Sequence, residues 1–114
     1  MAKDDMHLLI YKILRYLYDC NKKGKTPYFS DMFAAAELSA IPQGYLAQII
    51  EELINGGYIE GCTIIRAKDG TQFNLTENAR VTMHGVEYLT ENSRMKKAAK
   101  VAGKAFEILL SQII

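Results

Sequence analysis

The sequence has no tryptophan, only two cysteines and only two prolines in 114 residues. A secreted domain held by disulfides would contain more cysteine than Cys20 and Cys62, so this pair favours a reducing compartment. No apolar run approaches the roughly 18 residues of a membrane-spanning helix. The polar, acidic start from Met1 to Asp5 is unlike a signal peptide. We therefore expect a cytoplasmic protein without a membrane partner.

The sequence also lacks a marked excess of charge of either sign. Its 14 lysine and arginine residues stand against 13 aspartate and glutamate residues, a formal net charge of +1. This balance excludes a uniformly basic protein that binds nucleic acid over its whole surface. The length and the 49% apolar content fit one folded domain with a single core. Any nucleic acid must then be bound by a local patch.

The first half of the chain has the apolar spacing of three helices. Residues 4–23 carry apolar side chains at intervals of three and four, which predicts an amphipathic helix. Ser30 is a suitable N-cap for a short second helix. Ser39 can cap a third helix that has Pro42 in its first turn and stops at Asn55-Gly56-Gly57. Two helices joined by so short a turn predict a helix-turn-helix.

The second half begins with a change to strand-like sequence. Residues 58–66 are rich in β-branched side chains, which predicts a strand. Asp69-Gly70 is a typical hairpin turn. A second strand at residues 73–75 continues to Val81 beyond a break at Glu77-Asn78. The pattern therefore predicts a β-hairpin directly after the third helix.

Two further helices complete the predicted fold. Thr82 is placed to cap a short helix, and Ser93 begins a final helix of about 20 residues. We expect a mainly α fold with a small β-hairpin (α+β), which is a winged helix-turn-helix over residues 1–92. The additional long C-terminal helix, residues 93–114, packs on this domain or on a second subunit.

Three stretches of the sequence resemble a known family. Ile10–Leu17, Gly57–Gly61 and Thr82–Ala98 are similar to segments of the YjcQ-like family, small proteins of Gram-positive bacteria and their phages. Thr82–Leu89 also resembles the segment after the wing in winged-helix regulators of the MarR and PadR type. The resemblance implies a winged-helix fold and nucleic-acid binding, and it carries no catalytic residues.

In a fold of this kind the third helix is expected to read the major groove. Its outward positions include Gln43, Gly44, Tyr45, Ala47 and Gln48. The glutamines can pair with adenine edges, the tyrosine can reach a phosphate and the alanine can contact a thymine methyl. The helix has no lysine or arginine, however, and Glu51 and Glu52 would repel phosphates. Groove insertion and a purely structural helix therefore both stay open.

The hairpin supplies a second candidate contact. Arg66 and Lys68 lie at its predicted turn, and Arg80 lies beyond the second strand. In a wing, these side chains would bind phosphates or the adjacent minor groove. The alternative is a solvated polar tip, because Asp69 partly cancels the positive charge.

The largest local charge lies in the last helix. Residues 94–104 contain five cations and no acid, which leaves nine cations against 13 acids in the rest of the chain. The five are Arg94, Lys96, Lys97, Lys100 and Lys104. We expect them to bind phosphates or to border a dimer interface.

An apolar stripe runs beside these cations. It consists of Met95, Ala98, Ala102, Ala105, Phe106, Leu109 and Ile113, and is widened by Val101, Ile108, Leu110 and Ile114. So broad a stripe exceeds what one groove usually covers. We expect it to pack against the first helix or, in a two-fold homodimer, against a second copy. Packing within one chain is the alternative to the dimer.

These features favour sequence-directed binding of duplex DNA, in transcriptional control. The alternative is a protein-interaction module that uses the acidic third helix and the apolar final helix. We expect no enzyme, metal site or cofactor, because His7 and His84 have no partner residues at a suitable spacing. If the hairpin cations share one surface with the glutamines of the third helix, DNA is favoured. If acids dominate that surface, a protein partner is favoured.

Overall fold

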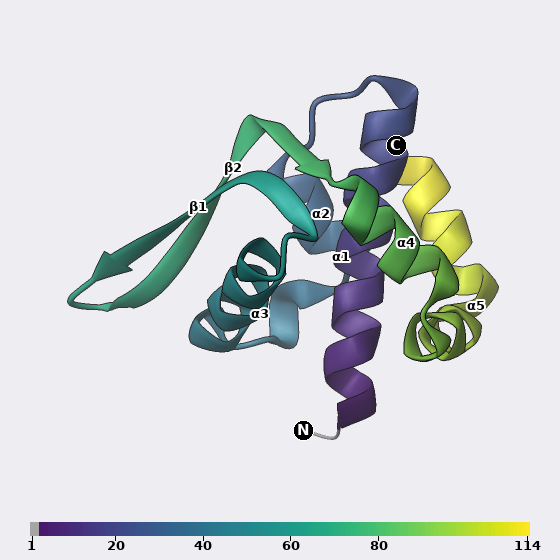
Figure 1. Ribbon diagram of the computed structural model, residues 1–114, viewed down its shortest axis with the longest axis horizontal. Coiled ribbons are helices and arrows are strands. Elements are labelled where there is room, and N and C mark those ends of the chain that lie inside the picture. Colours follow the sequence, from purple (N-terminus) through teal and green to yellow (C-terminus); the bar gives the residue numbers. More distant parts are fainter. Residues whose placement is uncertain (1–2) are drawn as a thin grey trace.

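The structure, a computed structural model, describes residues 3–114 and the side chains from Met6 onward. In chain order the elements are α1 (Lys3–Lys23), α2 (Phe29–Ala35), the 3₁₀ turn η1 (Leu38–Ala40), α3 (Gln43–Asn55), β1 (Ile59–Ala67), β2 (Gly70–Val81), α4 (Met83–Glu91) and α5 (Ser93–Ile113). Figure 1 shows α1 in the middle, with α2, α3 and the hairpin on one side and α4 and α5 on the other. The expected fold class is confirmed: a mainly helical chain with a two-stranded antiparallel hairpin, a long C-terminal helix and a winged-helix-like layout. No helix within residues 3–114 combines the length and the apolar character needed to cross a bilayer.

Helix α1 is the centre of the hydrophobic core. Its Ile13, Leu14 and Leu17 side chains are completely buried, because α2, α4, α5 and β2 all pack against this helix. Burial of each such side chain contributes about 1.5–3 kcal/mol. The three-and-four spacing predicted α1 correctly, since that spacing places its members on one face of a helix.

The helix-turn-helix begins at residues other than those predicted. Helix α2 starts at Phe29, so Ser30 lies inside it and does not cap it. Ser39 lies in η1, and the N-cap of α3 is Pro42, which has no capping side-chain bond. The physical reason is that proline disfavours helical backbone in the residue before it. The 3₁₀ turn therefore ends ahead of Pro42, and α3 begins after it.

The hairpin is longer than predicted and turns at a different pair of residues. Ala67 is paired with Gly70, so the two-residue loop is Lys68-Asp69 and not Asp69-Gly70. Strand β2 is continuous from Gly70 to Val81. The positive φ at this end of the hairpin belongs to Gly70, the paired residue directly after the loop, at +124°, a value that glycine adopts without strain.

A bulge lies where the sequence predicted a break in the second strand. The register changes between the pairs Glu60–Arg80 and Cys62–Leu75, which leaves extra residues of β2 unpaired around position 78. Gly61 faces them with a φ of +79°, and a Cβ atom there would lie 2.4 Å from the Asn78 carbonyl oxygen. The bulge therefore depends on glycine at position 61.

The caps of α4 and α5 are side-chain caps. Thr82 Oγ1 accepts a hydrogen bond from the Gly85 N–H at 3.0 Å, which confirms its predicted role. Helix α5 starts at Ser93 as predicted, but its cap is Asn92, whose Oδ1 accepts from the Arg94 N–H at 2.9 Å. Capping of this kind stabilises a helix by about 1 kcal/mol.

Helix α5 is bent at Gly103. This residue has a φ of 66° and a ψ of −166°, so α5 consists of two helical segments that meet there. Beyond the bend Phe106 and Leu110 are buried, whereas Ala105 is exposed. Ala105 of the predicted apolar stripe is therefore not covered within the chain, and its packing against a second copy stays a prediction.

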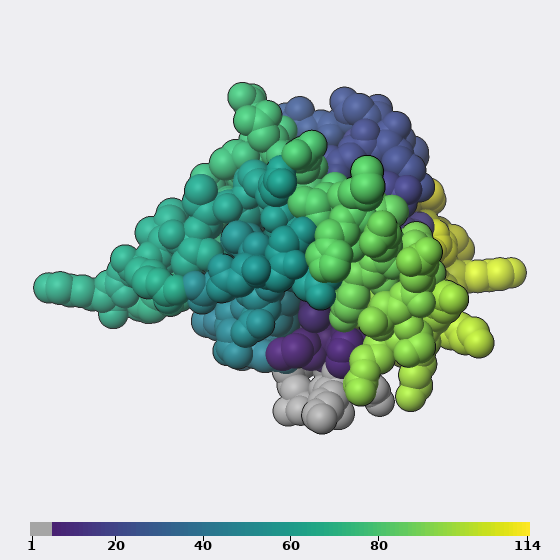
Figure 2. Space-filling view, viewed as in Figure 1, coloured from purple at the N-terminus to yellow at the C-terminus, as the bar shows by residue number. Residues whose placement is uncertain are grey.

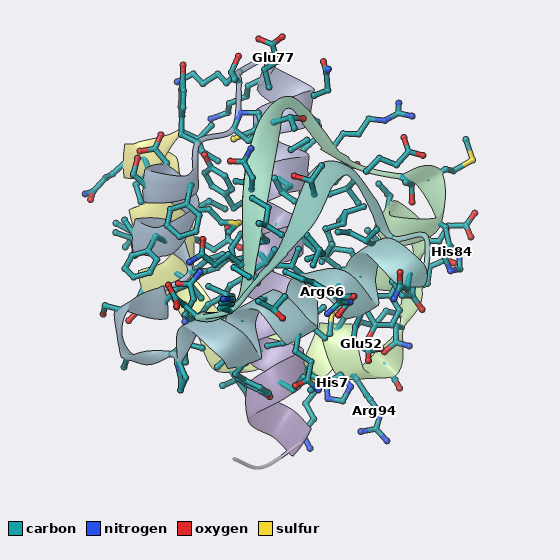
Figure 3. The ribbon with its side chains drawn as sticks, turned by 90° about the vertical axis from the view of Figure 1, so that its left-hand side faces the viewer. His7, Glu52, Arg66, Glu77, His84 and Arg94 are labelled. Carbon is teal, nitrogen blue, oxygen red and sulfur yellow. The ribbon has the colours of Figure 1, made fainter. Side chains whose placement is uncertain are left out.

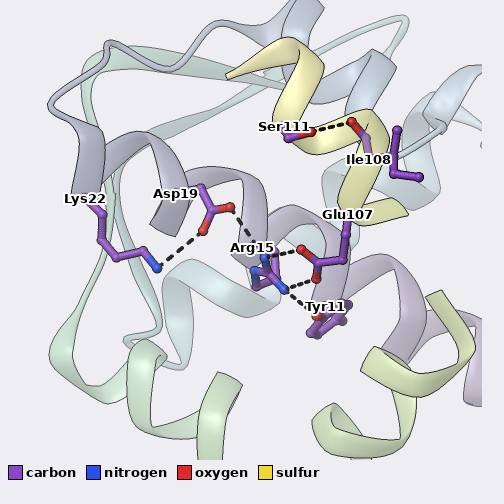
Figure 4. A network of polar contacts seen from close by, with 7 residues as sticks. All are labelled: Tyr11, Arg15, Asp19, Lys22, Glu107, Ile108 and Ser111. Atoms are coloured by element: carbon purple, nitrogen blue, oxygen red, sulfur yellow. Dashed lines mark hydrogen bonds and ion pairs between the residues drawn. The ribbon is translucent and has the colours of Figure 1, made fainter. Parts of the chain in front are cut away.

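The second segment of α5 packs on α1 within the same chain. The Phe106 ring is 2% exposed and its centroid lies 5.8 Å from that of Tyr11. Beside them, the Arg15 guanidinium donates to both carboxylate oxygens of Glu107 at 2.6 and 2.9 Å (Figure 4). These hydrogen bonds hold the pKa of Glu107 below its usual value. Of the predicted packing residues, Ala98 and Phe106 are buried, and Ala102, Leu109 and Ile113 are half-buried.

Candidate nucleic-acid interface

The start of α3 presents a small polar surface without charge. Gln43, Gly44 and Gln48 are exposed there, while Leu46 and Ile49 point into the core. In Figure 1 this helix lies at the edge of the molecule, on the side from which the hairpin projects. Glutamine side chains at the start of such a helix can reach base edges in a major groove.

Two neighbouring residues of α3 are less exposed, and so less able to contact DNA, than the sequence suggested. Ala47 is completely buried, so the expectation that it faces outward and contacts a thymine methyl is wrong. It lies three residues before Ile50 and therefore on the same buried side of the helix. Tyr45 is half-buried and packs against the core.

The hairpin and α3 are joined by an ion pair. Arg66 of β1 donates to the Glu51 carboxylate of α3. Figure 3 shows the hairpin in front of α3, with Arg66 and Glu52 on the side that faces the viewer. Since Arg66 is 67% exposed, the pair is worth at most about 1 kcal/mol. The Arg66 side chain can therefore exchange this partner for another anion.

Arg80 lies at the base of the hairpin and is also paired. It stands opposite Glu60 in the strand register, and its Nε and Nη2 atoms donate to Glu60 Oε2 at 2.9 and 2.6 Å. Lys68 lies at the loop, at the other end of the hairpin. The structure therefore does not gather the three predicted wing cations at one place.

The surface formed by α3 and the hairpin is acidic as a whole. Residues 43–81 contain three cations and five acids, a net charge of −2. Arg66 and Arg80 each neutralise one of these acids. Glu52, Asp69 and Glu77 have no such partner among residues 6–114. Favourable contact with phosphate is thus restricted to the start of α3 and the hairpin loop.

The first segment of α5 carries the strongest unpaired positive charge on the described surface. All five of its cations are exposed: Arg94, Lys96, Lys97, Lys100 and Lys104. None of them forms an ion pair with a described side chain, whereas Lys12, Arg15 and Lys22 of α1 all do. Arg94 lies in the first turn of the helix, where the helix dipole disfavours cations.

The basic segment and the hairpin lie apart on the molecule. In Figure 2 the hairpin projects at one side, and the surface of α4 and of the start of α5 occupies the other. One monomer therefore does not place the α5 cations next to Arg66 and Lys68. The sequence showed the charge of each segment but contained no signal for their separation.

An aromatic stack at the base of the hairpin was not predicted. The Tyr58 ring stacks on His84 with centroids 4.7 Å apart and planes 11° apart, and it lies equally close to Tyr88. Tyr58 directly precedes β1 and the other two residues lie in α4, so no local pattern in the sequence links them. The stack fastens α4 to the hairpin and places His84 in a structural contact.

Comparisons with known proteins give one family match. A family model described as YjcQ protein matches residues 11–107, which run from α1 into the second segment of α5. A search of curated proteins and a search of solved structures return no match to this chain.

Proposed function

The chain belongs to the YjcQ protein family, and from this premise we propose that it is a cytoplasmic winged-helix protein that binds duplex DNA in transcriptional control. In this proposal the start of α3 enters the major groove with Gln43 and Gln48 at base edges. Lys68 contacts the backbone from the hairpin loop. The main support is the exposed, uncharged start of α3, with the nearest acid, Glu51, already neutralised by Arg66.

The cations of α5 supply the electrostatic attraction in this proposal. Binding of a labelled random duplex pool, measured by fluorescence anisotropy at several salt concentrations, should weaken steeply with salt, because phosphate contacts release counterions. Replacing Lys96, Lys97 and Lys100 by alanine should lower the log–log salt slope by up to about three. An unchanged slope would remove α5 from the interface, and no binding at low salt would reject DNA as the ligand.

Releasing Arg66 from its acid should strengthen DNA binding. We expect Glu51→Gln to raise affinity for duplex several-fold at low salt, because it removes one repulsive charge and frees a guanidinium for phosphate. Glu87→Gln on α4 is the matched control, since Glu87 is exposed and forms no ion pair with a described side chain. Equal effects of the two variants would mean that Arg66 does not contact DNA.

A protein partner is the second candidate, and one observation favours it. The net charge of −2 over residues 43–81 suits a basic protein surface better than a phosphate backbone. Ile65 on the hairpin and Met83 at the start of α4 are exposed large apolar side chains on this part of the chain. If the anisotropy experiment finds no duplex binding at low salt, this candidate takes precedence.

We also propose a homodimer through the outer face of the second segment of α5. Ala105 and Ile108 are exposed and Leu109 is half-exposed, so an apolar surface remains after Phe106 has packed on α1. We expect Ile108→Glu to shift a dimer to monomer in size-exclusion chromatography with light scattering. A wild-type chain that is monomeric at tens of micromolar would contradict this proposal.

A further inference from the structure

A groove lies between the first turns of α1 and the first segment of α5. Its volume is about 420 Å³, within the range of about 300–1,000 Å³ that is usual for small-molecule sites. Leu8 of α1 and Ala98 and Val101 of α5 form its apolar wall. The Val101 side chain is 66% exposed, so this wall is uncovered in the chain alone.

The polar lining of the groove is cationic. Arg94, Lys97 and the neutral Ser93 line it from α5 and His7 lines it from α1, and none of the lining residues with a described side chain (residues 6–114) is a carboxylate. Figure 3 shows His7 and Arg94 next to each other at the lower end of the molecule. Arg94 and Lys97 lie three residues apart and therefore on one side of the helix. An anion in the groove would face two positive side chains at once.

Without a bound anion, the positive side chains at the start of α5 destabilise the helix. Like charges three or four residues apart destabilise a helix, as for Lys97 and Lys100. Arg94 also lies at the positive end of the helix dipole, and the first turn has no acid. The Asn92 side chain already accepts from the Arg94 and Met95 N–H groups. A bound anion would relieve this repulsion chiefly through the side chains.

We propose that this groove binds a free medium-chain alkyl carboxylate. The carboxylate lies between Arg94 and Lys97, where a guanidinium can donate two parallel hydrogen bonds to it. The alkyl chain covers Leu8, Ala98 and Val101. An alkyl chain suits this wall because its apolar residues, Leu8, Ala98 and Val101, are all aliphatic.

Isothermal titration calorimetry of the full chain with decanoate tests the proposal. The experiment contains no DNA, so its result does not depend on whether the proposed DNA binding is correct. We expect one saturable site with a Kd on the order of 0.1 mM. Acetate, which lacks the chain, and decyltrimethylammonium, which reverses the charge, should bind at least about tenfold more weakly. Equal binding of acetate or of the cation would overturn the proposal.

Variants locate the site on the groove. Arg94→Gln and Lys97→Gln should each weaken decanoate binding about tenfold, and the uncharged Val101→Asn should weaken decanoate without affecting acetate. Lys23→Gln removes the same charge from an exposed position at the end of α1 and should change the Kd less than twofold. All four positions are on the surface or the groove wall, and circular dichroism checks that each variant is folded.

An anionic lipid membrane also presents negatively charged and apolar groups, so the groove could bind a membrane and not a free carboxylate. Binding to vesicles distinguishes these two ligands. Sedimentation with vesicles of phosphatidylglycerol and phosphatidylcholine should not depend on Arg94 and Lys97 if the ligand is a free carboxylate. The proposal would be refuted if the wild-type chain bound vesicles but not decanoate, and if Arg94→Gln and Lys97→Gln abolished the vesicle binding. The groove would then be a membrane-binding surface. Wild-type affinity for decanoate in both variants would refute it as well.

Discussion

Replacing Gly85 by alanine should lower the free energy of unfolding by about 3 kcal/mol. Gly85 lies in the first turn of α4 and is buried. A Cβ atom there would lie 2.1 Å from the Tyr58 carbonyl oxygen and 2.6 Å from Val81 Cγ1. The backbone cannot yield without loss of the hydrogen bond from the Thr82 N–H to the Tyr58 carbonyl oxygen. Urea unfolding followed by circular dichroism measures the change.

Gly44→Ala is the matched control for this substitution. Gly44 also lies in the first turn of a helix, α3, but its Cβ would meet no atom within 4 Å. The same chemical change should therefore stabilise the chain by about 0.5–1 kcal/mol, because alanine loses less backbone entropy in a helix than glycine. Equal effects of the two variants would show that α4 is not seated on Tyr58 as the structure describes.

Replacing Phe106 by alanine should cost about 3–5 kcal/mol of stability. The ring is 2% exposed and packs against Tyr11, and it also faces the cationic groups of Lys12 and Arg15 at 5.8 and 6.0 Å. Truncation would leave a cavity between α1 and the second segment of α5. Thermal and urea unfolding would measure the loss.

Ile108→Ala provides the comparison for Phe106. Ile108 lies two residues away in the same helical segment but is 57% exposed, so its truncation should change the stability of the monomer, measured at a protein concentration too low for a dimer, by less than about 0.5 kcal/mol. We expect the loss in Phe106→Ala to be independent of protein concentration, because the ring is buried within one chain. If the difference in stability between the wild-type chain and Phe106→Ala disappeared when both were diluted, Phe106 would lie in a subunit interface instead.

Much of the fold was predictable because its signals are local. The stripe of α1, the stop at Gly56 and the Thr82 cap each depend on residues within a few turns of one another. The predictions at Ser30 and Ser39 failed because a serine caps only a helix that starts directly after it, and α2 and α3 start at Phe29 and Gln43. The steric effect of Pro42 on the residue before it decided that start for α3.

The candidate site was less predictable than the fold. Gln43 and Gln48 are exposed as expected, because their position on a helical wheel follows from the apolar stripe alone. Arg66 and Arg80 appeared in the sequence as free cations, yet each has an acid from a different segment within bonding distance. The Glu60–Arg80 pair depends on a strand register that the bulge shifts, and the sequence indicated a break at Glu77-Asn78 but not the size of that shift.

The near-zero net charge and its uneven division along the chain follow from composition and order alone, and they exclude a uniformly basic surface. Tertiary packing determines which of these charged side chains form ion pairs. Ion pairing requires two groups within about 4 Å, so the approach of β1 to α3 and of α1 to α5 decided it. That packing neutralised the hairpin arginines with Glu51 and Glu60, and left the cations of α5 without an ion pair to any side chain of residues 6–114, beside an open groove.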